Sequence, residues 1–366
     1  MAEHIVVVGA GYAGLAAAKL AARWTGARVT LVNERDRFVE RVRLHQLAAG
    51  QRLRDLPLGD LLRGTGVELV VDRVTGIDAE TRRVRLTGGE LTYDRLVYAL
   101  GSRAGLDVPG AAEHAHPLAT LEDAEALAGA LRAARRVAVV GGGLTGVEAA
   151  AELAEARPDL EVVLVTGDEL GAALSAKGRR YLRGVFDRLG VVVRDRVTVA
   201  EVRAEGPVLG DGELVPADAV VWTAGFRVPD LAREAGFAVD ARGRMLVDET
   251  LASVSHPEVL GIGDAAAIRL PDGLELRMAC ATGLPTAQQA VRALAARMAG
   301  REPRPLRFRY RNQCVSLGRR DGLIQFVRAD DSPVERVLTG RAAARYKELI
   351  VRGTVLFERH PVLPAG

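Results

Sequence analysis

Two glycine-rich turns carry the clearest chemical signal in the sequence. Both read GxGxxG, with Gly9, Gly11 and Gly14 in the first turn and Gly141, Gly143 and Gly146 in the second, 132 residues further on. Each turn follows a short apolar run, at residues 5–8 and 137–140, and precedes an alanine-rich stretch. Such a turn lets main-chain N–H groups and a helix N-terminus bind a pyrophosphate. The repeat therefore predicts two dinucleotide sites in one chain.

The residue after the second strand of each unit should bind a ribose. In the first unit Asn33 follows the apolar run at 29–32, with Glu34 beside it. Glu34 is either a second ribose ligand or a solvated loop charge. In the second unit Asp168 follows the run at 162–165, and no arginine stands there to meet a 2′-phosphate. This pattern favours NADH over NADPH.

Cysteine and histidine usage excludes several chemistries. The two cysteines, Cys280 and Cys314, are 34 residues apart, and the six histidines show no HExxH spacing. Neither a disulfide framework nor a metal site is therefore expected.

A further apolar run at 259–262 ends at Gly263 and Asp264, which places an acid at the end of a strand.

The elements that must position these residues are two βαβ units, and hence two parallel sheets. Runs at 96–101, 219–225 and 259–264 supply further strands. After Pro303 and Pro305 the sequence pattern changes, and the apolar residues Leu306, Phe308 and Tyr310 alternate with polar ones. We expect a turn at residues 318–322, a further strand through Val327 and a helix near 341–352. We predict an α/β protein with two Rossmann-like domains and a small C-terminal α+β domain. The expected boundaries are 1–110 and 240–305 for the first domain, 111–239 for the second and 306–366 for the third.

Composition indicates a soluble globular protein of two or three domains. The chain has 366 residues, 48% hydrophobic and 27% charged, and no uncharged apolar run long enough to cross a bilayer. The start of the sequence lacks a basic region and a signal peptide pattern, so we expect a cytoplasmic protein. The net charge is +3, but residues 307–366 hold 12 basic and 6 acidic residues. A basic C-terminal face fits this distribution better than nucleic-acid binding.

With these motifs in place, the sequence resembles the two-dinucleotide-binding-domain flavoproteins of the pyridine nucleotide–disulfide oxidoreductase superfamily. Within them it is most similar to the type II NADH:quinone oxidoreductase and apoptosis-inducing-factor-like branch. The resemblance implies FAD at the first turn and NAD(H), or less favourably NADP(H), at the second. The residues expected to bind FAD are Gly9, Ala10, Gly11, Tyr12, Ala13, Gly14, Asn33, Glu34, Arg41, Val74, Ala99, Gly101, Gly263, Asp264, Thr286 and Ala287. Those expected to bind NAD(P)H are Gly141, Gly143, Thr145, Gly146 and Asp168.

The resemblance also implies candidate catalytic residues. Glu148 lies in a stretch similar to the branch's GGGxTGxExAxEL motif, where an acid lies near nicotinamide and flavin. A simpler alternative is that Glu148 only complements the positive end of its helix. Residues 41–50 resemble the segment beside the flavin, with Arg41 as a flavin contact and His45 as a candidate proton donor or a packed histidine. This segment has no cysteine pair, which excludes disulfide reduction.

Residues 287–292 resemble the quinone-side AQxxxQ pattern of the type II enzymes. Gln288 matches the first glutamine, whereas Arg292 replaces the second. Gln288 is either an acceptor-site residue or a helix-surface residue. Pro285 is expected at the first position of its helix. The short C-terminal helix is expected to pack on the body of the protein, with at most weak, peripheral membrane contact.

Together these features predict an FAD-dependent NAD(P)H oxidoreductase that passes hydride from NADH through the flavin to a small quinone-like acceptor. Two alternatives stay open: a biosynthetic flavoenzyme acting on an aromatic metabolite, and an NAD(P)H-dependent ferredoxin-type reductase whose basic C-terminal region docks an acidic iron–sulfur protein. The oligomeric state is open, with a homodimer as one form.

Overall fold

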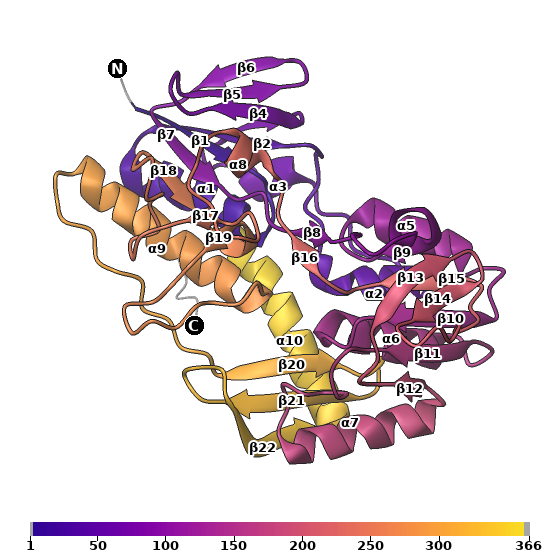
Figure 1. Cartoon of the computed structure of the whole chain (residues 1–366). Helices are drawn as coiled ribbons and strands as arrows, with labels where there is room; N and C mark the ends of the chain where they lie inside the picture. Colours follow the sequence, from indigo (N-terminus) through magenta and orange to yellow (C-terminus); the bar gives the residue numbers. More distant parts are fainter. Residues whose placement is uncertain (1–2, 362–366) are drawn as a thin grey trace.

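The first parallel sheet contains the first glycine-rich turn. The computed structural model describes residues 3–361 (Figure 1). The strands of this sheet run in the order β18-β7-β1-β2-β3, all parallel. Their bounds are β1 His4–Val8, β2 Arg28–Asn33, β3 Glu68–Val71, β7 Arg95–Tyr98 and β18 Val259–Gly261. Residues 5–8 are fully buried because other elements cover both faces of β1, which explains the unbroken apolar run.

Two long helices pack together against this sheet, α1 (Tyr12–Thr25) and α9 (Cys280–Met298). An antiparallel sheet of β4 (Val74–Asp78), β5 (Arg83–Leu86) and β6 (Gly89–Thr92) covers its other side. Shorter elements of this region are η1 Arg41–Arg43, α2 Leu44–Ala48, α3 Leu58–Leu62, α8 Leu231–Glu234, β17 Met245–Leu246, η2 Gly263–Ala265 and β19 Ala266–Ala267. The chain returns to this core before residue 240, since Ala232 and Phe237 already pack in it.

The second parallel sheet repeats the arrangement, in the order β12-β11-β10-β15-β9. Its strands are β9 Ala115–Pro117, β10 Arg136–Val140, β11 Glu161–Val165, β12 Val192–Arg194 and β15 Ala219–Trp222. Its helices are α4 Ala111–His114, α5 Leu121–Ala130, α6 Leu144–Ala156 and α7 Ala176–Leu189, and β13 (Val199–Arg203) pairs with β14 (Gly206–Leu209). The pairing of β8 (Arg103–Ala104) with β16 (Phe226–Arg227) links the two sheets. The predicted fold class is thus confirmed.

The C-terminal unit is a three-stranded antiparallel sheet and one long helix. The elements are β20 Asn312–Ser316, β21 Gly322–Val327, β22 Pro333–Thr339 and α10 Gly340–Arg359. Residues 306–310 form no strand, although they alternate in polarity. Leu306, Phe308 and Tyr310 instead pack as an irregular segment against the first core. The helix is also longer than the predicted 341–352.

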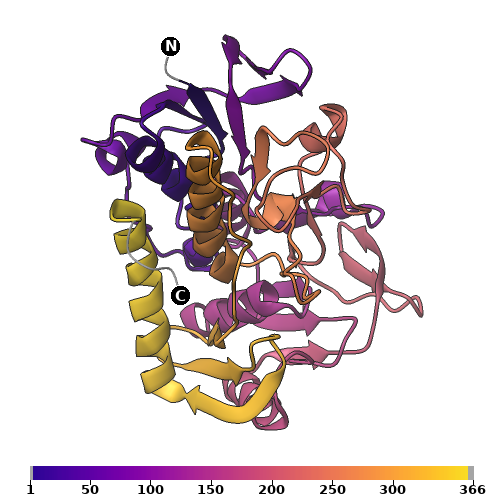
Figure 2. The same cartoon turned by 90° about the vertical axis from the view of Figure 1, so that its left-hand side faces the viewer.

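Helix α10 connects the C-terminal sheet to the first domain, as Figures 1 and 2 show. Lys19 of α1, 7% exposed, donates hydrogen bonds from Nζ to the main-chain oxygens of Leu61 (2.9 Å), Glu358 (2.6 Å) and Arg359 (2.9 Å). One ammonium therefore satisfies two of the carbonyls that would otherwise be unpaired at the end of α10. Within residues 3–361, no helix combines the length and the apolar character needed to cross a bilayer.

The Glu358 side chain lies fully buried beside this lysine, and neither of its carboxyl oxygens has a hydrogen-bond partner. Burial raises the pKa of Glu358 well above its usual 4.5. The native state therefore holds this proton at a pH where the unfolded chain releases it. The stability contributed by the protonated group is complete below pH 4.5 and is lost as pH rises through the higher native pKa.

We accordingly expect Glu358→Gln to match the wild type in stability near pH 4.5 and to exceed it increasingly at higher pH. The difference should grow by up to about 1.4 kcal/mol per pH unit inside the titration window. Urea unfolding of both proteins between pH 5 and 9 measures it. Glu125→Gln, at an exposed position of α5, is the control and should show no such trend. A constant difference across this range would contradict the prediction.

Candidate active site

The first glycine-rich turn is shaped so that its middle glycine faces open space. Gly9 has φ +96°, and a Cβ there would lie 2.5 Å from the main-chain oxygen of Ala99. A Cβ on Gly14 would overlap the oxygen of Gly9. A Cβ on Gly11 would meet no protein atom within 4 Å. The outer glycines are therefore required by the protein itself, whereas the side of the turn at Gly11 is open to a ligand.

The second turn has the same geometry. Gly141 has φ +118° and lies against Thr223, with only 2.6 Å from a Cβ to Thr223 Oγ1. A Cβ on Gly146 would overlap the oxygen of Gly141, and a Cβ on Gly143 would meet nothing within 4 Å. Both turns therefore leave room for a phosphate next to a helix N-terminus, at α1 and at α6.

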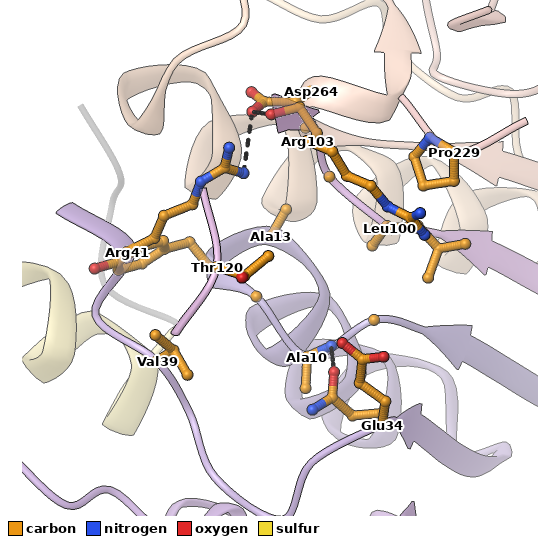
Figure 3. A pocket seen from close by; sticks show the side chains of 18 of the residues that line it. Ala10, Ala13, Glu34, Val39, Arg41, Leu100, Arg103, Thr120, Pro229 and Asp264 are labelled. Carbon is orange, nitrogen blue, oxygen red and sulfur yellow. Dashed lines mark hydrogen bonds and ion pairs between the residues drawn. The ribbon is translucent and has the colours of Figure 1, made fainter. Parts of the chain in front are cut away.

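A cavity opens at the carboxyl end of the first sheet, beside Gly11 (Figure 3). The residues predicted to bind FAD that line it are Gly9, Ala10, Gly11, Tyr12, Ala13, Asn33, Glu34, Arg41, Val74, Ala99, Gly101, Gly263 and Asp264. Lining residues that sequence reasoning missed include Val39, Ser102, Arg103, Thr120, Pro229 and Cys280. Several of these come from loops far apart in the chain, where no local pattern marks them.

Asp264 and Arg41 face each other across one end of this cavity (Figure 3). Arg41 Nη1 lies 4.0 Å from Asp264 Oδ2, and Ser102 Oγ donates to the same oxygen at 2.7 Å. Asp264 belongs to η2 and is not a helix cap. The Arg41 guanidinium can bind a phosphate, and the Asp264 carboxylate can accept hydrogen bonds from hydroxyl groups. Both properties fit the ribityl-pyrophosphate part of an FAD.

The side-chain amide of Asn33 forms its hydrogen bonds within the protein. Its Oδ1 accepts from the main-chain N of Ala10 at 2.9 Å, and its Nδ2 donates to the oxygen of Arg35 at 2.8 Å. The amide therefore holds the glycine-rich turn in shape. Glu34 lines the same cavity and, among residues 3–361, forms an ion pair only with Arg35, at 2.7 Å. Of the two, Glu34 has the carboxylate available to a ribose.

Thr286 and Ala287 lie behind the cavity wall. Both are fully buried, and neither lines the cavity. Thr286 Oγ1 accepts from Gly263 N at 3.2 Å and donates to Gly283 O at 2.9 Å, which positions the turn that carries Asp264. The prediction that Pro285 begins the helix was wrong. Helix α9 begins at Cys280, Pro285 lies inside it, and the positive N-terminal end with Ala279 and Cys280 lines the cavity.

The residues predicted to bind NAD(P)H lie at the carboxyl end of the second sheet. Gly143 and Thr145 stand where β10 passes into α6, and Asp168 is exposed just beyond β11. The main-chain N of Arg196 donates to Asp168 O at 3.3 Å, so this arginine belongs to the same edge. Its guanidinium lies 3.7 Å from Glu169. Sequence reasoning missed Arg196, because it follows a different strand.

Glu148 lies where α6, β20 and α10 meet. Its Oε1 accepts from the main-chain N of Ser316 at 2.9 Å and forms an ion pair with Lys347 of α10. The two side chains are 12% and 14% exposed. Burial, and then the charge of Arg43, lower the pKa of Lys347 to about 7. The acid of the second domain is thus joined to the C-terminal unit.

His45 of α2 lies against the same junction. Its ring nitrogens lie 3.9 Å from Glu148 Oε2 and 3.9 Å from Glu152 Oε2, and Nε2 has no hydrogen-bond partner. Burial, followed by the charge of Lys347, lowers the pKa of His45 well below its usual value. A neutral, packed imidazole results at physiological pH. Glu152 accepts from Gln51 and pairs with Arg319 at 2.9 Å.

Gln288 is buried, so the helix-surface interpretation was wrong. It is 4% exposed, and its Nε2 donates to Pro361 O at 2.8 Å, which ties α9 to the end of the described chain. Arg292, one helical turn further on, stands over the ring of Trp24 at 5.6 Å. The two positions of the glutamine pattern therefore have different surroundings.

The thiols are not arranged for redox exchange. Cys280 lines the nucleotide cavity, whereas Cys314 is in β20 and donates to Asn312 Oδ1 at 3.2 Å. Burial raises the pKa of Cys314 to about 12. Both are free, and residues 3–361 contain no histidine, cysteine or acid cluster suited to a metal ion.

Two equivalent glycine-rich turns, each on its own parallel sheet, together with an acid–arginine pair beside the first, define a two-dinucleotide-binding-domain oxidoreductase. The chain belongs to the pyridine nucleotide–disulphide oxidoreductase family, whose model matches residues 3–293. Proteins of this family bind FAD and NAD(P)H.

Similar proteins fall into more than one kind. An NADH dehydrogenase-like protein of Mycobacterium tuberculosis is 36% identical over 78% of both chains. A probable ferredoxin reductase of Castellaniella defragrans is 32% identical over 83% of this chain and 77% of its own. A demethylphylloquinone reductase of Synechocystis is 27% identical over 86% and 84%. The sulfide:quinone oxidoreductase structure from Aquifex aeolicus superposes with a TM-score of 0.84 at 21% identity, over 100% of this chain and 93% of that one, which shows a shared fold.

Proposed function

We propose that the protein is an FAD-dependent oxidoreductase that passes a hydride from NADH through the flavin to a quinone-like acceptor. The observation that carries the proposal is the flavin-side segment 41–50, which contains no cysteine and packs against the Glu148–Lys347 pair. Electrons therefore have no disulfide to pass through. Bound FAD would supply two-electron chemistry, and the protein would supply position and charge.

Each residue then has a proposed role. The main chain at Gly11 and Gly143 binds the two pyrophosphates, and Asp264 accepts from ribityl hydroxyls with Arg41 beside it. Glu34 and Asp168 bind the riboses. Glu148, held by Lys347 and Ser316, keeps a negative charge next to the second turn, while neutral His45 fills the space behind it. Gln288 keeps α9 and the end of α10 in register on the acceptor side.

The testing experiment follows the flavin absorbance of the purified protein in a stopped-flow instrument without oxygen. NADH should bleach it, and duroquinone or menadione should restore it within a catalytic turnover. The relatives named as NADH dehydrogenase-like and demethylphylloquinone reductase support this expectation. A folded protein with no affinity for FAD, or one that NADH does not bleach, would refute the proposal.

We expect NADH to be preferred over NADPH by about tenfold in kcat/KM, or roughly 1.4 kcal/mol. Asp168 is exposed at the ribose end of β11 and repels a 2′-phosphate, and the guanidinium of Arg196, whose main-chain N donates to Asp168 O, already faces Glu169. Initial rates of flavin reduction with each nucleotide measure the ratio. Asp168→Asn should lower this ratio of NADH to NADPH rates. A preference for NADPH that disappears in Arg196→Gln would show that Arg196 binds the phosphate.

A second candidate function is reduction of an acidic iron–sulfur protein. The probable ferredoxin reductase among the relatives favours it, as does the basic C-terminal unit. Turnover would then fall steeply with salt, since exposed charges attract over only about 8 Å at physiological ionic strength. Turnover with a neutral quinone that is insensitive to salt favours the first candidate.

We further propose that the protein acts in the cytoplasm and that its membrane contact is at most weak and peripheral. Exposed Leu349 and Leu356 of α10 are flanked by Arg345 and Arg352, a combination that gives only reversible attachment.

A further inference from the structure

A second hollow lies outside the nucleotide cavity, between α2, the turn joining β20 to β21, and the first half of α10. It encloses about 890 Å³, within the range of small-molecule sites. Seven arginines and one lysine line it, against a single carboxylate, Glu348. We call this hollow the basic cleft.

Half of these cations have no counter-charge in the protein. Among residues 3–361, no ion pair joins an acid to Arg52, Arg320, Arg341 or Arg345, and all four are exposed. The one carboxylate is already taken, because Glu348 pairs with Arg43 and with Arg352, both at 2.8 Å. The cleft therefore has a surplus of positive charge that only a ligand or salt can neutralise. Arg341 and Arg345 also lie in the first turns of α10, whose positive end adds to the potential.

The floor of the cleft contacts α6 of the second nucleotide domain. Lys347 and Ser316 line the cleft, and both bind Glu148 Oε1 from this side. Arg319 lines it as well and pairs with Glu152 of the same helix, α6. A ligand in the cleft is thus one layer of side chains away from the acid next to the second turn.

The wall of the cleft is equally thin toward the nucleotide cavity. Segment η1 separates the two hollows: Arg41, at its start, lines the nucleotide cavity, whereas Arg43, at its end, lines the cleft. A single turn of 3-10 helix therefore separates the basic cleft from the nucleotide cavity. This placement distinguishes the cleft from a remote basic surface.

We propose that the basic cleft binds the anionic group of the electron acceptor, so that the acceptor is a quinone-type aromatic molecule carrying a carboxylate or a similar anion. The inference rests on the proposed function and names the substrate class of its acceptor side. Arg341, Arg345, Arg52 and Arg320 hold the anionic group by charge-assisted hydrogen bonds. A concave site of this size suits a small molecule better than the surface of a folded protein.

The net reaction balances without another reactant. The C4–H bond of NADH breaks and its two electrons leave with the hydride, giving NAD⁺. With one proton taken from solvent, the two carbonyl oxygens of the quinone become hydroxyl groups. The anionic group is unchanged and serves only to place the ring.

The first test measures binding and needs no turnover. Naphthalene-2-sulfonate and its neutral analogue naphthalene-2-sulfonamide are titrated calorimetrically into the FAD-loaded protein. The sulfonate should bind more tightly, and Arg341→Gln/Arg345→Gln should weaken it about tenfold. Arg242→Gln, an exposed arginine of the first domain outside both hollows, is the matched control and should bind as the wild type does. Equal affinity for sulfonate and sulfonamide, or no effect of the double variant, overturns the proposal.

The second test compares acceptors. The ratio of kcat/KM for 1,2-naphthoquinone-4-sulfonate to that for 1,2-naphthoquinone should exceed one and fall about tenfold in the double variant. A ratio unchanged by the double variant, despite sulfonate binding, shows that the cleft binds anions away from the acceptor path and overturns the assignment. If NADH reduces no quinone at all, the proposed function fails separately, while the titration still decides whether the cleft binds an anion. Competition by an acidic iron–sulfur protein but not by the small anions assigns the cleft to a macromolecule and also overturns the proposal.

Discussion

Replacing Gly143 with alanine should give a folded protein that retains FAD but binds NADH at least about tenfold more weakly. The backbone of Gly143 has φ −68° and ψ 175°, which alanine adopts without strain, and the added Cβ meets no protein atom within 4 Å. Its only obstacle is a phosphate approaching the turn. The matching Gly11→Ala should lose FAD for the same reason.

The measurement is the NADH concentration dependence of flavin bleaching, with the ratio of flavin to protein absorbance as the check on FAD content. Gly184→Ala, in α7, adds a methyl group in equally open space away from both turns and is the control. If Gly143→Ala binds NADH as tightly as the wild type does, the second turn is not the nicotinamide nucleotide site.

Removing one member of the Glu148–Lys347 pair should be costly. We expect Glu148→Leu to lower the free energy of unfolding by about 3 kcal/mol, because a largely buried ammonium would keep only the carbonyl of Cys314, at 3.3 Å. Removing both charges in Glu148→Leu/Lys347→Met should recover most of the loss. Lys177→Met, at an exposed lysine, is the control.

The stability of Glu148→Leu should show a defined pH dependence. Burial and Arg43 lower the pKa of Lys347 from 10.5 to about 7 in the native protein. Between these values the unfolded chain binds the proton that the native chain does not, so stability rises with pH across this window. Glu148→Leu should lower this native pKa further, so its penalty should be largest well below pH 7, shrink as pH rises to about 7, and stay constant above it, where the lysine is neutral in both native proteins. A double variant as unstable as the single one would contradict the pairing.

The strands and glycine-rich turns could be predicted because their signals are local. Spacing alone placed Gly9 and Gly141 after buried strands, and the repeat supplied the second domain. Pro285 misled because proline is common at helix starts, yet packing on α1 extends α9 back to Cys280. Residues 306–310 alternate like a strand, but no neighbouring strand is available there, and the segment lies irregularly over the first core.

Most of the remaining site depends on contacts between distant residues. Nothing near Glu148 in the sequence indicates Lys347, 199 residues later, or the main chain of Ser316. Asn33 occupies the ribose position of the pattern, but its amide is used by the turn itself. The surplus charge of residues 307–366 was visible in the composition, whereas its gathering into a cleft with residues 43–52 depends on the contact of α10 with η1, made by Glu348 and Arg43.

The two lysines that fasten α10 also determine how the protein can be chemically labelled. The chain has three lysines in all: Lys19 gives its hydrogens to three carbonyls, and Lys347 is buried on Glu148. A compact ammonium fits both places, and the wide, planar guanidinium of arginine would not. Of the lysine side chains only that of Lys177 is exposed. An amine-reactive dye or a surface-coupling reagent should therefore attach at this side chain while the protein is folded and should reach Lys19 only as α10 comes loose, whereas Lys347 is accessible only from the basic cleft that it lines.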